Sequence, residues 1–195
     1  MNVVEAALRG GVRLVQLREK DLPTRELVAL ATELRSITRR YEAALLINDR
    51  IDVAVAVAAD GVHLPASSFS VADARRLLGP RRLIAVSTHS PEDAAAAGEA
   101  GADFVVFGPV FETPSKRAYG PPVGLERLSA TVEATKVPVF AIGGITHDRI
   151  EAIVAHGASR VAVIRALLEA DDPAEATRSC LINLQRGSQA AKRAR

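Results

Sequence analysis

Short, continuous apolar runs that alternate with helical patterns restrict the fold of this 195-residue chain more than any other feature. The runs 44–47 and 83–86 are apolar at every position rather than at alternate positions. Strands of this kind are buried on both faces, as in a parallel sheet that is covered by helices. We therefore expect an α/β fold with a parallel sheet.

Seven such strands are predicted, each separated from the next by a helical pattern. The predicted strands span 14–18, 44–48, 61–64, 83–87, 103–108, 137–142 and 160–164. The predicted helices span 3–9, 27–41, 53–58, a segment opened by Ser70, 91–98, 125–135, 149–156 and 173 to about 186. Two helices carry start signals: Ser70 with Asp73 three residues on, and Ser90 followed by Pro91.

Seven βα units fit either a TIM-type (βα)8 barrel that lacks its first β-strand or an open doubly wound sheet. The first element, Val3–Arg9, has a helical pattern, whereas a complete barrel would begin with a strand. Polar residues follow the carboxyl ends of nearly all the strands, which is where barrels build their active sites. We favour the barrel, as a single domain over residues 1–195, because the chain contains no linker or low-complexity tract.

Composition excludes several classes of function. Apolar residues make up 48% and charged residues 25%, and the net charge is only +2, so neither disorder nor a nucleic-acid groove is expected. No apolar run reaches the roughly 18–20 residues of a membrane span, and the start lacks the pattern of a signal peptide. We therefore expect a cytoplasmic protein with no membrane partner, and a homodimer is possible.

The single cysteine and the four histidines also limit the chemistry. Cys180 excludes an internal disulfide and a cysteine-rich zinc site, and its apolar surroundings predict a buried thiol. The histidines have no metal-binding spacing. His63 lies near the end of a predicted strand and His89 follows one, and we expect both to be structural or to orient a substrate rather than to act as acid or base.

The residues at the strand ends indicate an anionic ligand. Arg18, Lys20 and Lys116 supply cations, and Gly143-Gly144, between a strand and a helix, would expose N–H groups to a phosphate. Alternation along the first strand would place Gln16, Arg18 and Lys20 on one face. The alternatives are that Gly143-Gly144 is only a turn and that Arg18 lies at a solvated strand end. The other polar residues at these ends are Asn48, Asp49, Arg50, His63, Ser87, Thr88, His89, Thr113, Ser115 and Arg165.

Asp49 has two interpretations. Its carboxylate could hold Mg²⁺ against phosphate groups. It could instead cap the following helix or pair with Arg50.

Six motifs occur in a fixed order along almost the whole chain. They are 15–20 (VQLREK), 47–50 (INDR), 61–64 (GVHL), 86–90 (VSTHS), 108–116 (GPVFETPSK) and 141–145 (AIGGI). Together they resemble the thiamine-phosphate synthase family and its sister family, the thiazole tautomerases. The resemblance implies a (βα)8 barrel.

The resemblance also implies a reaction. A hydroxymethylpyrimidine diphosphate would lose pyrophosphate, and the nitrogen of a thiazole phosphate would attack the exposed carbon to give thiamine phosphate. Mg²⁺ and cations would stabilise the leaving group. By this resemblance Gln16, Arg18, Lys20 and Asn48 hold the diphosphate, Asp49 binds Mg²⁺, Ser87 and Lys116 contact the departing pyrophosphate, and Thr113, Ser115, Gly144 and the backbone near Ile164 hold the thiazole phosphate.

The sequence departs from the family pattern at two site positions. Ser68 stands where the family has a second Mg²⁺-binding Asp, which predicts a weaker metal site, and Arg165 stands where the synthases have a Ser. Arg165 could add a phosphate contact or block the usual one. The leading hypothesis is a synthase-like enzyme. The alternatives are a thiazole tautomerase, a non-catalytic binder of thiazole or thiamine phosphate, and an unrelated phosphate-binding barrel.

Overall fold

The computed structural model describes residues 1–114 and 120–193, with side chains up to residue 190. Within this part of the chain the sheet has seven strands, all parallel, in the order of the sequence. The predicted parallel α/β fold is confirmed. The strands are β1 (Leu14–Leu17), β2 (Ala44–Asn48), β3 (Gly61–Leu64), β4 (Leu83–Thr88), β5 (Phe104–Phe107), β6 (Val139–Ile142) and β7 (Arg160–Ala162).

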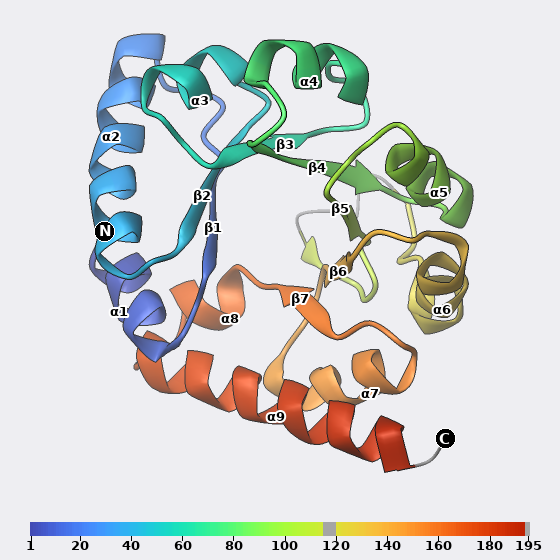
Figure 1. Ribbon diagram of the computed structural model, residues 1–195. Coiled ribbons are helices and arrows are strands. Elements are labelled where there is room, and N and C mark those ends of the chain that lie inside the picture. The colour runs from blue at the N-terminus through green and yellow to red at the C-terminus, as the bar shows by residue number, and fades with distance from the viewer. Residues whose placement is uncertain (115–119, 194–195) are drawn as a thin grey trace.

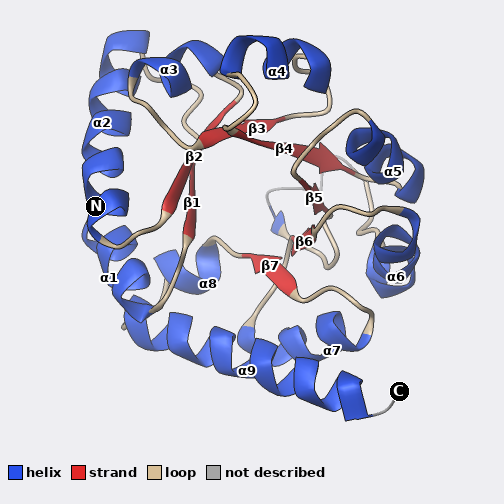
Figure 2. Cartoon of the chain, viewed as in Figure 1, coloured by secondary structure: helices blue, strands red, loops and turns tan. Residues whose placement is uncertain are grey.

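Helices surround the outside of this curved sheet (Figure 1). Figure 2 shows the same separation, with the strands inside and the helices outside, apart from the short helix α8, which is drawn between β1 and β7. In the described residues the helices are α1 (Asn2–Gly10), α2 (Thr24–Arg40), α3 (Ile51–Ala56), α4 (Val71–Leu78), α5 (Pro91–Glu99), α6 (Gly124–Ala134), α7 (Ile150–Ala155), α8 (Arg165–Leu168) and α9 (Pro173–Arg193), with a 3₁₀ turn η2 (His147–Arg149) before α7.

Both predicted helix starts are confirmed. The Ser70 hydroxyl oxygen accepts a hydrogen bond from the backbone N–H of Asp73 at 3.1 Å and donates to its carboxylate at 2.6 Å. Ser90 accepts from the backbone N–H of Asp93 at 3.1 Å, and Pro91 is the first residue of α5. These caps satisfy N–H groups that have no partner within their own helix.

Two boundaries differ from prediction at the C-terminal end of the chain. The last strand ends at Ala162 rather than Ile164, because Ile164 leaves the extended conformation and precedes the short helix α8, which was not predicted. Helix α9 continues to Arg193 rather than ending near Arg186. Just beyond Arg186, Gly187 packs closely on α7, since a Cβ there would lie 2.9 Å from the Cβ of Val154, and most of the residues from Gln189 onward have high helix propensity.

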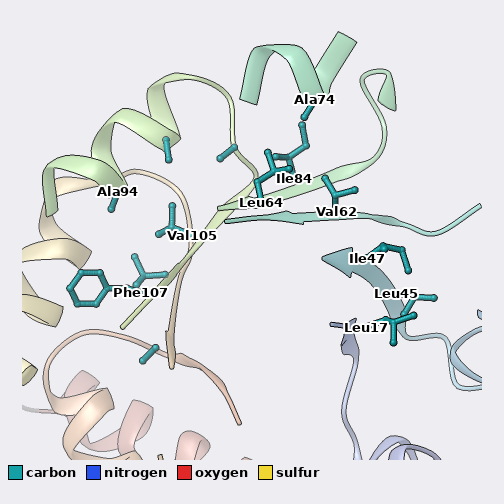
Figure 3. Close-up of a cluster of buried hydrophobic side chains, with 14 of the residues drawn as sticks. Leu17, Leu45, Ile47, Val62, Leu64, Ala74, Ile84, Ala94, Val105 and Phe107 are labelled. Atoms are coloured by element: carbon teal, nitrogen blue, oxygen red, sulfur yellow. The ribbon is translucent and has the colours of Figure 1, made fainter. Parts of the chain in front are cut away.

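The larger part of the core lies between the sheet and the helices. Figure 3 shows Leu45, Ile47 and Val62 from the strands and Ala74 from α4 within this cluster. A second, smaller cluster consists of buried Leu46, Ala85, Phe104 and Val106, with Leu14, Leu83, Phe140 and Ile142 packed against it. Leu45 and Leu46 are consecutive, so the two clusters occupy opposite faces of the sheet. The second cluster therefore fills the inner, concave face.

Cys180 is buried on α9, as predicted, and burial raises the pKa of its thiol. No helix in the described residues combines the length and the apolar character needed to cross a membrane.

In the order of the sheet, β1 and β7 stand at its two ends. Figure 1 shows the sheet curving so that these end strands approach each other, with α8 drawn between them. The carboxyl ends of all seven strands therefore meet at one end of the curved sheet, because the strands are parallel. This arrangement brings the predicted site residues into one region.

Candidate functional site

A layer of polar side chains lies directly above the inner apolar cluster. Leu46 and Ala85 belong to that cluster, and each is followed two residues later by a polar residue, Asn48 and Ser87. Residues two apart on a strand share a face. On β1, Gln16 lies two residues after Leu14, which packs on the same cluster. On β3, His63 pairs with Asn48 of β2 and so lies at the same level of the sheet. The members of the layer are Gln16, Asn48, His63 and Ser87.

Hydrogen bonds connect these residues in pairs. The Gln16 Nε2 donates to Asn48 Oδ1 at 3.0 Å, between β1 and β2. His63 Nε2 and Ser87 Oγ lie 2.8 Å apart, between β3 and β4. The structure thus brings together four residues that the sequence placed at separate strand ends.

His63 is held in its neutral form. Only 6% of the residue is exposed. Burial, together with the nearby positive charge of Arg18, lowers the pKa of the imidazole from 6.5 to about 4. Arg18 must therefore lie close enough to His63 to act on it electrostatically.

The predicted alignment of Gln16, Arg18 and Lys20 along one strand does not reach Arg18 and Lys20, although the charge of Arg18 still acts on His63 of the inner layer. Strand β1 ends at Leu17, where its pairing with Ile47 of β2 ends, and the next residues form an irregular loop. In this loop the Glu19 carboxylate accepts hydrogen bonds from the backbone N–H groups of Lys20 and Asp21 at 3.0 and 3.5 Å. Arg18 and Lys20 are exposed on the loop rather than aligned by a strand.

Asp49 turns out of the sheet directly after β2. Its backbone N–H still donates to the His63 carbonyl at 2.9 Å, but its φ of 66° is left-handed. Aspartate adopts this conformation more readily than most residues. Its exposed carboxylate accepts a hydrogen bond from the Ser68 hydroxyl, which comes from the loop after β3.

The structural interpretation of Asp49, as the cap of α3 or the partner of Arg50, is supported only in part. The Arg50 guanidinium bonds the carboxylate of Asp52, at 2.6 and 2.9 Å, and the Thr24 hydroxyl at 3.1 Å. The residue that caps α3 is Arg50, and its side chain forms no capping hydrogen bond. Asp49 therefore does not cap α3, but its charge does act on Arg50: the hydrogen bond and charge of Asp52, and then the charge of Asp49, raise the pKa of the Arg50 guanidinium.

The oxygens of Asp49 and Ser68 fit a magnesium ion that is shared with a ligand. Mg²⁺ prefers oxygen ligands and is commonly held by one or two carboxylates together with substrate phosphates. Within residues 1–114 and 120–193, no group of three or more His, Cys, Asp or Glu side chains could hold a metal on its own. The metal site stays a prediction, and it would need further oxygen ligands from water or from a bound phosphate.

The loops after β5 and β7 meet on another side of the site. Thr113 is buried, and its hydroxyl oxygen accepts a hydrogen bond from Arg165 Nη2 at 3.0 Å, across 52 positions in the sequence. Ile164, just before Arg165, is 60% exposed. His89 is exposed and its Nδ1 lies 2.5 Å from the Gly108 carbonyl oxygen. Ser115 and Lys116 fall outside the described residues.

The local backbone conformation requires glycine at positions 143 and 144. Both have positive φ, 98° and 63°, which glycine adopts without strain. A Cβ at Gly143 would lie 2.4 Å from the Cβ of Pro109, and one at Gly144 would lie 2.5 Å from the Glu112 carbonyl oxygen. The turn interpretation is thus sufficient to explain both glycines, and phosphate binding there stays a prediction.

One residue of this region was not expected from the sequence. Arg149 donates from Nη1 to the Gly144 carbonyl at 2.7 Å, and its guanidinium carbon lies 4.8 Å from the centre of the Phe111 ring. In the sequence Arg149 is only the first residue of a predicted helix. No pattern of neighbouring residues indicates which loops its side chain will join.

Comparison with known proteins identifies the family. The family model for thiamine monophosphate synthase matches residues 1–167. The chain belongs to this family. A relative from Geobacter sulfurreducens is 55% identical over 179 residues, which cover 92% of this chain and 84% of the relative. The thiamine-phosphate synthase of Gloeobacter violaceus is 46% identical over 187 residues, which are 96% of this chain but only 54% of that protein.

A solved structure agrees with these relatives. The thiamine phosphate pyrophosphorylase from Pyrococcus furiosus superposes with a TM-score of 0.88 at 37% identity, over 96% of this chain and 90% of that one. The family resemblance predicted from the six motifs is confirmed, and so is the predicted synthase-like function. The comparisons do not favour the tautomerase or the binder.

The lowered pKa of His63 predicts that acid destabilises the protein. The unfolded chain takes up a proton at this histidine below about pH 6.5, whereas the folded protein does so only near pH 4, so stability is lost as the pH falls between these values. We expect a loss of about 3 kcal/mol in the free energy of unfolding from this group.

Urea denaturation of the wild type and of His63→Asn, between pH 7 and pH 4, measures this effect. The variant should lose less stability over that range. His147→Asn, at an exposed histidine, serves as the control and should behave as the wild type does. Equal acid sensitivity of His63→Asn and the wild type would contradict the prediction.

Proposed function

We propose that this chain joins a hydroxymethylpyrimidine diphosphate to a thiazole phosphate at the polar inner layer. The bond between the pyrimidine methylene carbon and the diphosphate oxygen breaks, and the bond between that carbon and the thiazole nitrogen forms. Pyrophosphate leaves with the electron pair of the broken bond. The observation that supports this site best is the polar layer made of two hydrogen-bonded pairs, Gln16 with Asn48 and His63 with Ser87, with the charge of Arg18 acting on His63, in a chain of this family.

The chemistry calls for stabilisation of charge rather than for a strong base. As the bond breaks, positive charge develops on the pyrimidine methylene and negative charge on the diphosphate. Preorganised cations and hydrogen-bond donors lower the barrier most when they face the developing charge. In this proposal Gln16, Asn48, Arg18 and Lys20 bind the diphosphate, and Ser87 and Lys116 contact the pyrophosphate as it leaves.

Burial determines what His63 can contribute to the reaction. His63 is buried and neutral at pH 7, so it is poorly suited to supply a proton to the leaving group. Its hydrogen bond to Ser87 instead fixes the direction in which the Ser87 hydroxyl points. We assign His63 to substrate orientation through this contact. His89, exposed at the neighbouring strand end, would help to orient the substrate.

Asp49 and Ser68 would hold Mg²⁺ together with the diphosphate oxygens. When bound, the ion would neutralise part of the negative charge on the leaving group. Because Ser68 provides a neutral hydroxyl in place of a second carboxylate, this chain holds the metal with less charge. We propose that the site is assembled only when the diphosphate is present.

The thiazole phosphate would bind at the loops after β5, β6 and β7. Arg165 is held by Thr113 and presents a cation there, so we assign it to phosphate binding rather than to blocking the site. Gly143 and Gly144 would donate backbone N–H groups. The remaining assignments on this side are Ser115 and the backbone at Ile164.

Three further expectations extend this proposal to the architecture. The seven strands would correspond to a (βα)8 barrel without its first strand, and residues 1–195 would form one domain. A second copy of the chain is the proposed partner in a homodimer. Sedimentation of the purified protein would test the last of these.

A direct assay tests the proposed function. The protein is mixed with the pyrimidine diphosphate, the thiazole phosphate and Mg²⁺, and thiamine phosphate and pyrophosphate are both measured. Equal amounts of the two products, formed over many turnovers, are expected. Binding of both substrates without any product would contradict the proposal.

Arg18→Ala should lower kcat/KM by at least about a hundredfold, because it removes a cation from the developing negative charge. Arg18 is exposed, so the free energy of unfolding should change by less than about 0.5 kcal/mol. Arg81→Ala is the control, since Arg81 lies just before β4, at the opposite end of the strands. Unchanged turnover in Arg18→Ala would remove this residue from the site.

Ser68→Asp should tighten metal binding by about tenfold in the presence of pyrophosphate, because it supplies a second carboxylate beside Asp49. Titration calorimetry with Mg²⁺ measures this directly, with and without pyrophosphate. Ser67→Asp adds the same charge one residue away and serves as the control. If Mg²⁺ binds neither the wild type nor Ser68→Asp in the presence of pyrophosphate, Asp49 is not a metal ligand.

A further inference from the structure

The loops after β5 and β6 are held together by a continuous series of hydrogen bonds. Beyond the last paired strand residues, the Val110 N–H donates to the Ile142 carbonyl at 2.8 Å. The Phe111 N–H then donates to the Gly143 carbonyl at 3.1 Å. Arg149 continues the series, since its Nη1 donates to the Gly144 carbonyl at 2.7 Å.

This series fixes three consecutive peptide groups of the loop after β6. The carbonyl of each residue belongs to the same planar group as the N–H of the next residue, and in a trans peptide the two point in opposite directions. Holding the carbonyls of Ile142, Gly143 and Gly144 therefore directs the N–H groups of Gly143, Gly144 and Ile145 away from those partners. Among the contacts of the described residues, the Gly144 carbonyl is held by a side chain, whereas the Ile142 and Gly143 carbonyls are held by backbone N–H groups.

Arg149 is held in place by a second contact. Its guanidinium carbon lies 4.8 Å from the centre of the Phe111 ring, within the range of a cation–π interaction. Phe111 belongs to the loop after β5, which continues to Thr113. Arg149 therefore joins both loops, although it is itself exposed on the turn η2.

We infer that Arg149 is a positioning residue for the phosphate group of the thiazole substrate: by holding the Gly144 carbonyl and the Phe111 ring, it keeps the backbone N–H groups of the β6 loop directed at that phosphate. This inference rests on the proposed function. Glycines at positions 143 and 144 allow the close approach of the loops but leave the backbone free to rotate. Arg149 removes that freedom before the substrate binds, so less ordering is required on binding.

Kinetics and binding with Arg149→Ala test this inference. We expect the KM and the Kd for the thiazole phosphate to rise about tenfold, which is the effect of one hydrogen bond together with its ring contact. The KM for the pyrimidine diphosphate and kcat should stay within about twofold of the wild type, because Arg149 acts on the Gly144 carbonyl and the Phe111 ring rather than on the residues proposed to hold the diphosphate. The thiazole alcohol, which lacks the phosphate, should bind the variant and the wild type equally.

Two further variants separate positioning from charge. Phe111→Leu removes the ring contact and should also raise the KM for the thiazole phosphate. In the double variant with Arg149→Ala, this KM should rise by less than the product of the two single-variant factors. Arg149→Lys keeps the charge but not the planar group that stacks on the ring, and should recover only part of the affinity. Arg178→Ala, on α9, is the control and should have no effect on any of these constants.

Each outcome has a distinct meaning. Full recovery of thiazole phosphate affinity in Arg149→Lys would show that Arg149 acts only through its charge. So would a double variant whose KM rises by the full product of the Arg149→Ala and Phe111→Leu factors, and either result would overturn the inference. An unchanged KM for the thiazole phosphate in Arg149→Ala would overturn it as well. If the wild type itself neither binds the thiazole phosphate nor forms product, the proposed function fails instead.

Discussion

The parallel register of the seven strands is the constraint on which the site depends. Each strand pairs with its neighbour in the order of the sequence, so equivalent positions stand side by side around the curved sheet. Side chains alternate between the two faces, so every second residue of a strand lies on the inner face. Along β4 the inner residues change from Ala85, in the apolar cluster, to Ser87, in the polar layer. A shift of one residue in any strand would move its polar side chain into the layer between sheet and helices.

Electrostatics then determine what the polar layer can do. His63 is surrounded by protein and lies near Arg18, so the imidazole is kept neutral and available for a hydrogen bond with Ser87. The cation next to it remains available for a negatively charged ligand. This division suits a reaction in which a diphosphate leaves, since the barrier is lowered by fixed charges rather than by transfer of a proton.

On the opposite side of the site, two arginines act on loops rather than on strands. Arg165 bonds Thr113, and Arg149 bonds Gly144 and stacks on Phe111, so both connect to the loop that follows β5. The strands are rigid because their backbone groups are paired, whereas loops need additional contacts to hold one conformation. Long, planar guanidinium groups are well suited to this task because they can bond a carbonyl and stack on a ring at once.

The sequence by itself determined the class of fold, the seven strands and the family. Continuous apolar runs and helix caps are local features, and they could be read without knowing which segments meet. The sequence also placed Gln16, Asn48, His63 and Ser87 at strand ends. The first strand, predicted over 14–18, ends one residue earlier at Leu17, because a strand ends where its partner strand stops pairing, and that is not a local property.

Only the tertiary structure decided which side chains meet. The contact between Asp49 and Ser68, the bond between Arg165 and Thr113, and the position of Arg149 between two loops each join residues from different βα units. Long polar side chains can reach several partners, and the choice among them depends on how closely the loops approach. That approach is set by packing, here by glycines that leave no room for a Cβ, and the sequence does not state which segments are packed together.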